Sequence, residues 1–577
     1  MKTYRRLILL VVAIVSSISI SACSLFLEHD NSPANNQSSD KENGNDEGDF
    51  HYGDDEEPTP ETPDTPVTPD EPVTPDDPET PVNPEPIEEP YVMESLKFNG
   101  INVENNLSKF IKQVDIDENT HNNNAIDHSL IISPYYTSTD LDIYASLTAN
   151  GVHSFAYVIT NKDPESEITL NYIENINNVE LLTPNVTTPT YKAENKSLKV
   201  SLKSFGTYTF ILNKDLNKPI TLYVEKDEEY IEGKTKVRTF DPGTYNEPII
   251  AQEGQLLYFK KGVYNILKIQ LANNSEIRFE DGTFITAINP SKANETPILD
   301  PDWADMTRFP AFINANYVNN LKISGRAIID LGKLTWHARL GLFFEHCNNV
   351  SCKDFMLVNS PEWTFELACC VSGTVNQVKL FGYRQNSDGF AIVDSQGITI
   401  RNCFARCGDD LFEVKSMYGA DTIEIKNIRF EYNTAWPDKC RGYGIIHETQ
   451  RNITDVKFSN CIVCAAPATW MDALGALVVI MANNSTCSDI TFTNIKINHN
   501  EFYPINVTMH EESSGTIKNI TFHNINYQNS NKIRILNSSS SGKIDGVYLT
   551  NIYRQGIRQS SGVIYKEGSN ITNVKMS

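Results

Sequence analysis

The sequence lacks a basic region that could bind nucleic acid. Its 577 residues include 49 Lys and Arg against 74 Asp and Glu, which gives a formal net charge of −25. Nucleic-acid-binding surfaces need clustered positive charge, and no such patch is present. A long apolar run is also missing, because the N-terminal run at residues 7–14 is short of the ~20 residues that span a membrane. We therefore expect no nucleic-acid partner, and we do not interpret the N-terminal segment as a membrane span.

Residues 1–23 have the features of a signal peptide. Three basic residues in the first six positions precede the apolar run, and small residues then lead to Cys23. The ending "ISAC" resembles the bacterial lipobox, in which the cysteine is lipidated and becomes the mature N-terminus. The alternative is an ordinary signal peptide with an incidental cysteine. We expect lipidation of Cys23, which would anchor the protein at the extracellular face of a bacterial membrane.

Residues 24–90 carry most of the negative charge. Between positions 28 and 89 there are 21 Asp and Glu and one Lys, so −20 of the net charge lies there. The Pro/Thr/Asp/Glu composition cannot bury a core and favours an extended, self-repelling chain. We expect a disordered linker, and the acidity therefore says little about any active surface.

Cysteine is confined to one region apart from Cys23. The other ten cysteines fall between Cys347 and Cys487. A disulfide framework is possible in an exported protein. The alternative, which we prefer, is that they are small buried residues in a repetitive core. Cys461 and Cys464 have the spacing of a metal or redox pair, but no second such pair accompanies them.

The folded part divides into two patterns, and neither has a helical period. Residues 91–235 alternate strand-like segments with polar turns, as expected of a small β-sandwich. Residues 236–577 repeat a turn, often with Asn, followed by a short strand, at spacings of about 22 to 34 residues. Repeats of several short strands at this period indicate a solenoid. We predict an all-β protein in which a right-handed parallel β-helix follows a β-sandwich.

Three aspartates in the repeat are separated by about one coil. Asp388 precedes the adjacent pair Asp409 and Asp410 by 21 and 22 residues. Residues one coil apart lie on top of each other in a β-helix, so these carboxylates should be neighbours. Close carboxyl groups cannot all ionise, and a protonated acid beside ionised partners suits glycoside hydrolysis. A calcium site and solvated turn residues are the alternatives.

Motifs around these aspartates resemble a known family. "LVNSPEWTFEL" at 357–367, the stretch from "NSDGF" to "GDDLFEVKS", and "RGYGIIHE" at 441–448 follow one another in order. They resemble the core of glycoside hydrolase family 28, the polygalacturonase-like β-helix enzymes. Family 49, the dextranase-like group of the same clan, shares the β-helix and the aspartates and has an N-terminal β-sandwich.

The resemblance implies roles for the aspartates. Asp409 would be the general acid, while Asp388 and Asp410 would activate water for a single inverting displacement without a cofactor. Asn386 would shape a turn of the site, and Lys415 lies where these families often carry a lysine near the substrate. These expectations define the catalytic set and the first substrate-binding candidates.

Departures from the family pattern bear on the substrate. The residue at the place of the family histidine is Tyr443, and His447 is a possible substitute. The Arg-Ile-Lys motif that meets uronate in polygalacturonases is missing, and the region 473–484 is apolar. The sequence therefore favours a neutral glucan, as in dextranase-like enzymes. Arg441 and Arg406 could replace the missing cations, which keeps a pectic substrate open.

Aromatic residues could stack on sugar rings. The candidates in the motif-bearing coils are Trp363, Trp436, Trp470, Tyr383 and Tyr443. Our leading prediction is a monomeric, surface-anchored, inverting glycoside hydrolase of an extracellular polysaccharide. The alternatives are a polygalacturonase-like hydrolase, a β-helix polysaccharide lyase and a non-catalytic carbohydrate-binding β-helix.

Overall fold

The computed structural model divides the chain into two units, Met1–Val92 and Met93–Ser577. It describes strands at 96–98, 101–103, 111–116 and 126–132, and then residues 153–577 except 161–166, 173, 185–186, 218, 227–235, 300–306, 383, 419–422 and 469–472. The predicted leader, Cys23 and the linker lie outside the described residues. No helix long and apolar enough to cross a membrane occurs in the described part.

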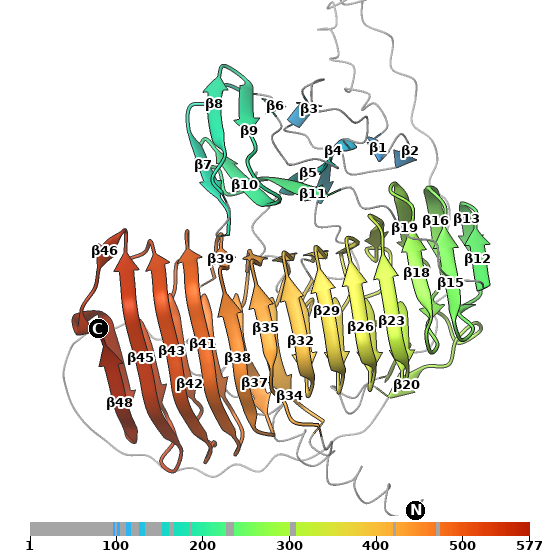
Figure 1. The fold of residues 1–577 in the computed structure, drawn as a ribbon. Coiled ribbons are helices and arrows are strands. Elements are labelled where there is room, and N and C mark those ends of the chain that lie inside the picture. The colour runs from blue at the N-terminus through green and yellow to red at the C-terminus, as the bar shows by residue number, and fades with distance from the viewer. Residues whose placement is uncertain are drawn as a thin grey trace, which may run out of the picture. The chain divides into compact units, whose positions relative to one another are not determined.

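Residues from Lys236 onward form a β-helix, in which strands of successive coils pair in parallel (Figure 1). One sheet takes one strand from each of twelve coils: β14 (Ile249–Ile250), β17 (Ile269–Gln270), β22 (Ile313–Asn316), β25 (Leu342–Glu345), β28 (Phe365–Ala368), β31 (Phe390–Val393), β34 (Phe412–Ser416), β37 (Tyr443–Thr449), β40 (Leu477–Met481), β42 (Ile505–Met509), β44 (Ile533–Asn537) and β47 (Ile564–Gly568).

A 23-stranded sheet forms the rest of the coils. Its strands are β12 (Lys236–Phe240), β13 (Gly243–Tyr245), β15 (Gln255–Phe259), β16 (Gly262–Ile266), β18 (Glu276–Phe279), β19 (Thr283–Ala287), β23 (Asn319–Ser324), β24 (Ile328–Asp330), β26 (Asn348–Lys353), β27 (Met356–Val358), β29 (Val371–Asn376), β30 (Lys379–Phe381), β32 (Gln396–Arg401), β33 (Phe404–Arg406), β35 (Ile428–Glu431), β36 (Thr434–Ala435), β38 (Ile453–Ser459), β39 (Ile462–Val463), β41 (Thr486–Ile497), β43 (Thr516–Tyr527), β45 (Lys543–Arg554), β46 (Ile557–Arg558) and β48 (Ile571–Met576). The short pair β20 (Ile298–Leu299) and β21 (Thr307–Arg308) and the 3₁₀ helix η2 (Ser561–Val563) complete this region. The all-β fold with a parallel β-helix is confirmed.

Alternation along each strand builds the core. In β38 and β41 the register pairs Phe458 with Phe492, and the same row includes Phe430 and Phe522. Adjacent rings stack with centroids 4.7, 4.6 and 4.8 Å apart, and all four side chains are fully buried. Such in-register aromatic rows fix the stacking of coils, because a shift of one residue would turn each ring out of the core.

Asparagines at bends in the strands of the 23-stranded sheet explain the Asn-rich repeat. Asn320, Asn349 and Asn494 have positive φ, which asparagine tolerates better than most residues. Their side-chain amides also bond between coils, as in Asn349 Nδ2 to Asn320 Oδ1 at 2.8 Å. The recurring asparagine therefore permits the bend of the chain, and its side chain links adjacent coils by hydrogen bonds.

Two smaller sheets precede the β-helix. One contains β4 (Ile126–Ile132), β5 (His153–Thr160), β11 (Ile220–Lys226), β10 (Gly206–Leu212) and β7 (Val179–Leu182). The other contains β3 (Ile111–Ile116), β6 (Glu167–Tyr172), β9 (Ser197–Ser201) and β8 (Thr190–Glu194), and a separate hairpin pairs β1 (Leu96–Phe98) with β2 (Ile101–Val103). Strands of both sheets share one apolar cluster. The predicted sandwich and its boundaries stay predictions, because much of 91–152 lies outside the described residues.

Buried contacts join these sheets to the β-helix. Glu225 at the end of β11 accepts a hydrogen bond from Arg326 Nε at 2.9 Å and pairs with Lys379 of β30. Arg406 of β33 pairs with Asp438 at 2.7 Å and contacts His153 of β5. Polar groups this deeply buried need such partners, so the contact is specific.

The ten cysteines from Cys347 to Cys487 are all buried, and none of them forms a disulfide. Seven of them belong to the apolar core inside the coils, as the preferred interpretation predicts, whereas Cys464 lies in the cluster that faces the preceding sheets and Cys440 lies beside Asp409 and Asp410. Burial raises the pKa of most of these thiols; that of Cys403, for example, rises to about 12. Protonated, buried thiols of this kind behave as small apolar residues.

Candidate active site

The three predicted aspartates come together where two adjacent coils enter the twelve-stranded sheet. Asp388 precedes β31, and Asp409 and Asp410 precede β34. The Gly389 amide donates a hydrogen bond to the Asp410 carbonyl at 2.7 Å, which places the two turns in direct contact. A Cβ on Gly389 would lie 2.4 Å from the Leu411 carbonyl oxygen, so only glycine permits this approach. The spacing of one coil therefore brings the carboxylates into one site.

Asp410 is held as an ion pair. Arg441 Nη1 lies 3.2 and 2.9 Å from its two carboxylate oxygens, and the Arg441 amide donates to the first oxygen at 3.0 Å. Both side chains are buried. A carboxylate that accepts hydrogen bonds from a guanidinium and from a backbone amide has a fixed orientation.

Asp409 is the most accessible of the three aspartates. Its side chain is half-buried, whereas Asp388 and Asp410 are 2% exposed. Burial raises the pKa of Asp409, and the neighbouring Asp410 carboxylate raises it further. A partly exposed carboxyl group that retains its proton has the properties of a general acid.

Asp388 is fully desolvated. Burial raises the pKa of its carboxyl group well above the usual range, and Asp409 adds to this, while Lys415 opposes it. The Lys415 ammonium lies 3.4 Å from Asp388 Oδ2. The Oδ1 atom is buried and has no hydrogen-bond partner among the described residues. That free oxygen could accept a proton from a water molecule.

Lys415 lies among carboxylates, as an active-site lysine would. Its ammonium is 3.3 Å from Glu413 and 3.6 Å from Glu448, and it lies 4.4 Å from the centre of the Trp363 ring. Burial lowers the pKa of Lys415, but the carboxylates, led by Glu413, outweigh it and raise the pKa well above the usual value. The charge of Lys415 is therefore already neutralised within the site.

Glu413 is a fourth carboxyl group that the sequence analysis missed. It is fully buried, and one of its oxygens lies within 4.8 Å of oxygens of Asp388 and Asp410. Strand alternation could have found it, because Glu413 and Lys415 are two residues apart in β34 and share a face. These three oxygens could ligate a cation, but the Lys415 ammonium contacts two of the three carboxylates and opposes a second positive charge there.

The prediction that Tyr443 contacts the substrate is wrong. Its side chain is fully buried in the core, stacked on Phe412 with ring centroids 4.9 Å apart, and its hydroxyl donates to the Ile462 carbonyl at 3.1 Å. The register pairs Tyr443 with Phe412, so both rings face inward. Arg441, two residues earlier, is the residue of this segment that meets the aspartates.

His447 lies beside this arginine. Arg441 Nη2 is 2.8 Å from His447 Nε2, and the His510 ring lies edge-on at 5.0 Å. Burial and the Arg441 charge lower the pKa of His447 well below its usual value, and that of His510 falls to about 4. His447 is therefore neutral, with Nε2 accepting from the arginine, and it holds Arg441 rather than supplying a proton.

The remaining substrate-binding candidates differ in position. Trp363 is 7% exposed and packs over Lys415. Asn386 lies half-buried in the turn before Asp388 at φ 59°, and its buried Oδ1 has no hydrogen-bond partner among the described residues. Trp436 belongs to the cluster between the β-helix and the preceding sheets, so its expected sugar-stacking role is wrong. Tyr383 and Trp470 lie outside the described residues.

Neither arginine proposed as a uronate partner is free for that role. Arg406 lies at the contact with the preceding sheets, and Arg441 is bound to Asp410. In the apolar region 473–484, Val478 and Ile480 form a buried cluster with Ile446. The substrate-facing cations expected of a uronate site are therefore absent from the described residues of these segments.

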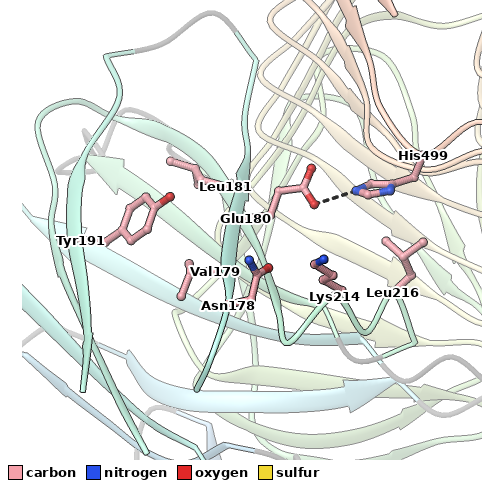
Figure 2. Close-up of a pocket in the computed structure, with 8 residues that line it drawn as sticks. All are labelled: Asn178, Val179, Glu180, Leu181, Tyr191, Lys214, Leu216 and His499. Atoms are coloured by element: carbon pink, nitrogen blue, oxygen red, sulfur yellow. Dashed lines mark hydrogen bonds and ion pairs between the residues drawn. The ribbon is translucent and has the colours of Figure 1, made fainter. Parts of the chain in front are cut away.

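A separate cavity of about 640 Å³ lies away from the carboxylates. Figure 2 shows its lining, in which Glu180 of β7 pairs with His499 of the β-helix at 2.8 Å. Tyr191 and Lys214 also line it, and none of the site carboxylates does. The carboxylate chemistry described above therefore belongs to a different place in the molecule.

A parallel β-helix in which carboxyl groups of adjacent coils lie together is an arrangement similar to that of the β-helix glycoside hydrolases. Residues 296–574 match the model of the family described as glycosyl hydrolases family 28, so this part of the chain is similar to that family. The resemblance to the clan of families 28 and 49 is thereby confirmed.

Two related sequences and one solved structure match part of this chain at low identity. An exopolygalacturonase of Zea mays is 24% identical over 240 residues, which covers 36% of this chain and 55% of that protein. An exopolygalacturonase of Platanus acerifolia is 22% identical over 307 residues, covering 49% of this chain and 76% of that protein. Among solved structures, a polygalacturonase from Erwinia carotovora ssp. carotovora is 16% identical, with a TM-score of 0.44, and covers 56% of this chain and 90% of its own.

Proposed function

We propose that the protein is an inverting glycoside hydrolase that cleaves a pectic, galacturonate-containing polysaccharide. The observation that carries the proposal is the convergence of Asp388, Asp409 and Asp410 inside the region that matches family 28. The sequence alone favoured a neutral glucan. The family match and the two exopolygalacturonase relatives favour the pectic alternative instead.

In the proposed mechanism Asp409 gives its proton to the glycosidic oxygen as the bond to the anomeric carbon breaks. Asp388 and Asp410 hold a water molecule on the opposite face of the sugar. The water oxygen bonds to the anomeric carbon, and its released proton passes to Asp388, whose Oδ1 is unpartnered among the described residues. Proton transfer of this kind contributes about 10²- to 10⁴-fold to the rate.

The proposal that the configuration at the anomeric carbon is inverted rests on the family resemblance. The closest oxygens of Asp409 and Asp410 lie within 4.8 Å, which is shorter than the ~6.5–9.5 Å between carboxyl groups in most inverting enzymes. A retaining mechanism would use one of the same carboxylates as a nucleophile. The two mechanisms therefore share residues and differ in the anomer that they release.

A neutral glycan is the second candidate substrate. It is favoured by the buried apolar cluster of Ile446, Val478 and Ile480 and by the pairing of Lys415 and Arg441 with carboxylates. A uronate substrate would meet an excess of negative charge in the site. The same site without activity would correspond to a non-catalytic carbohydrate-binding β-helix.

Release of reducing ends from polygalacturonate, rhamnogalacturonan, dextran and pullulan by the full chain separates these candidates. We expect activity on at least one of the two pectic substrates. Activity on dextran or pullulan alone would support the neutral-glycan candidate. Binding of a glycan without cleavage of any of the four would support the non-catalytic alternative.

We also propose that Cys23 anchors the protein to the outer face of the membrane, with residues 24–90 as a spacer. The proposal rests on the lipobox-like ending of the leader. Cys23→Ser should move the protein from the membrane fraction to the soluble fraction, and an unchanged distribution would contradict lipid anchoring.

A further inference from the structure

The loop at residues 331–341, between β24 and β25, is tied to the turn that carries Asp388. The Arg384 guanidinium donates hydrogen bonds to the carbonyl oxygens of Leu334 at 2.7 Å and Gly332 at 2.8 Å, and the Arg384 side chain is buried. A buried guanidinium that pairs with two carbonyls of another segment holds that segment in place. The 331–341 loop therefore has a fixed position beside the candidate active site.

Trp336 is the exposed aromatic residue of this loop. Its side chain is 38% exposed, whereas Trp363 and Trp436 are buried. The indole Nε1–H donates a hydrogen bond at 3.2 Å to the carbonyl of Gln385, three residues before Asp388. This bond satisfies the one polar atom of the indole, so the exposed part of the ring is apolar. Such a ring can stack on the apolar face of a sugar.

Trp336 lies within reach of a glycan bound at the aspartates. The Gly341 amide donates to the Trp363 carbonyl at 3.0 Å, and the Thr364 amide donates to the Asp388 carbonyl at 2.9 Å, so the loops of these coils are stacked in succession. The 331–341 loop precedes β25, and Asp388 precedes β31, two coils further along. The separation along the β-helix axis is therefore about 10 Å. A glycan that lies along the twelve-stranded sheet would place one sugar ring at each position.

Lys333 supplies a positive charge in the same loop, three residues before Trp336. Its side chain is exposed, and it forms no ion pair with a carboxylate in the described part of the chain. The loop sequence "LGKLTWHARLG" contains no Asp or Glu. The acidic residue that precedes the loop, Asp330, accepts hydrogen bonds from the Gly332 amide at 2.8 Å and from Asn359 Nδ2 at 3.3 Å. The Lys333 ammonium is therefore open to a ligand.

An exposed ammonium and an exposed aromatic ring have the chemistry that recognises a uronate sugar. The ring can stack on the pyranose, and the ammonium can pair with the carboxylate. The carboxylate cluster offers no such cation, because Lys415 and Arg441 already contact carboxylates there. An acidic polysaccharide would therefore find its attractive charge at the 331–341 loop rather than beside the aspartates.

We propose that Lys333 and Trp336 form a binding site for a uronate unit of the substrate, at a distance from the bond that is cleaved. Trp336 stacks on the sugar ring, and Lys333 pairs with the carboxylate of the same sugar. Neither residue takes part in bond cleavage. The inference rests on the proposed hydrolysis of a pectic polysaccharide and names the residues that recognise its charge.

Removing either group should weaken binding and leave the chemical step unchanged. Trp336→Ala should raise the KM for polygalacturonate by about 10- to 30-fold, because truncation of a tryptophan that anchors a ligand has an effect of this size. Lys333→Met should raise it by about 2- to 5-fold, as expected for an exposed ion pair. The kcat of both variants should stay within about twofold of the wild type. Trp336→Phe retains an aromatic ring and should raise the KM less than Trp336→Ala.

Binding without turnover separates the ring from the charge. The full chain with Asp409→Asn is titrated by calorimetry with oligogalacturonates and with their methyl esters, which have the same rings but no charge. Lys333→Met in this background should weaken binding of the free acids and leave binding of the esters unchanged. Trp336→Ala should weaken binding of both. Added salt should reduce the effect of Lys333→Met, because it screens an exposed ion pair.

Two variants on the 23-stranded sheet are the matched controls. Tyr432 lies between β35 and β36 and is 39% exposed, so Tyr432→Ala removes an equally exposed aromatic ring. Lys518 is an exposed lysine of β43, so Lys518→Met removes an equivalent charge. Both controls should have the KM and the binding constants of the wild type. Circular dichroism of each variant checks folding.

The outcomes separate this inference from the proposed function. If the wild type hydrolyses polygalacturonate and Trp336→Ala does so with an unchanged KM, the inference is wrong and the proposed function stands. The inference is also overturned if Lys333→Met weakens binding of the esters as much as that of the acids, or if oligogalacturonates do not bind. Absence of pectic hydrolysis by the wild type would instead refute the proposed function, and the titrations would still decide whether Lys333 and Trp336 bind a uronate.

Discussion

Replacing Asp409 by asparagine should remove hydrolysis without removing the fold. The amide has nearly the same size as the carboxyl group, and Asp409 is half-buried at a turn, where its Oδ1 accepts a hydrogen bond from the adjacent Asp410 amide at 3.0 Å. Asparagine retains that acceptor but cannot protonate a leaving oxygen. Loss of a general acid costs about 10²- to 10⁴-fold in kcat, which corresponds to about 3 to 5 kcal/mol of transition-state stabilisation.

The assay compares two kinds of substrate. Reducing-end release from the natural polysaccharide depends on protonation of a poor leaving group, whereas an aryl glycoside of the same sugar has a leaving group that needs no proton. Asp409→Asn should therefore lose activity on the polysaccharide and retain much of it on the aryl glycoside. Asp388→Asn should lose activity on both, because it impairs the water.

Asp489→Asn is the control for the chemical change itself. Asp489 is an exposed residue of β41 at φ 58°, where asparagine is well tolerated, and it lies on a different sheet. It should have wild-type kcat. Unchanged turnover of the polysaccharide by Asp409→Asn would refute the assignment of the general acid.

Two further substitutions test the electrostatics and the core. Lys415→Met removes the cation beside Asp388 and Glu413, two carboxyl groups whose pKa values are raised. Raised carboxyl pKa values make the folded state bind more protons than the unfolded state above about pH 4. The stability of the folded state therefore falls as the pH rises. The variant should lose about 3 to 5 kcal/mol at pH 7 and less at pH 5, as measured by thermal unfolding, and an equal loss at both pH values would contradict this explanation. Phe458→Ala removes the middle ring of the stacked row in the 23-stranded sheet. The variant should lose about 3 to 5 kcal/mol of stability and keep its kcat within twofold of the wild type. A loss below about 1 kcal/mol would show that the row does not hold the coils together.

The repeat could be predicted from the sequence because it follows from local rules. Asparagine at the turns tolerates positive φ, and alternating apolar residues fill the interior, so a spacing of one coil converts directly into stacking. Asp388, Asp409 and Asp410 meet for this reason. The cysteines inside the coils follow from the same alternation.

The letters of a motif do not show whether a residue of a strand faces the core or the solvent, because this depends on the alternation along the strand. In the segment "RGYG", Tyr443 stands where the family has a histidine. Tyr443 pairs with Phe412 in the sheet, however, and its ring therefore faces the core. Arg441 then lies at the site. Alternation places Glu413 on the same face as Lys415, but it does not reveal that this outward-facing side chain is buried beside the aspartates.

Contacts between distant segments could not be predicted. Trp436 and Arg406 were candidates for sugar or uronate binding, but they pack against the sheets that precede the β-helix. Nothing in a periodic pattern states which face of a solenoid another sheet will cover. The residues that the preceding sheets cover can be identified only when the positions of both the sheets and the β-helix are known.

The anomeric form of the first product tests the central mechanism most directly. Proton NMR of a polysaccharide digest, recorded before mutarotation, reports the configuration at the newly released reducing end. Attack by a water molecule held by Asp388 and Asp410 predicts the anomer opposite to that of the cleaved linkage. A retained anomer would contradict the single displacement and would indicate a covalent intermediate on one of these carboxylates.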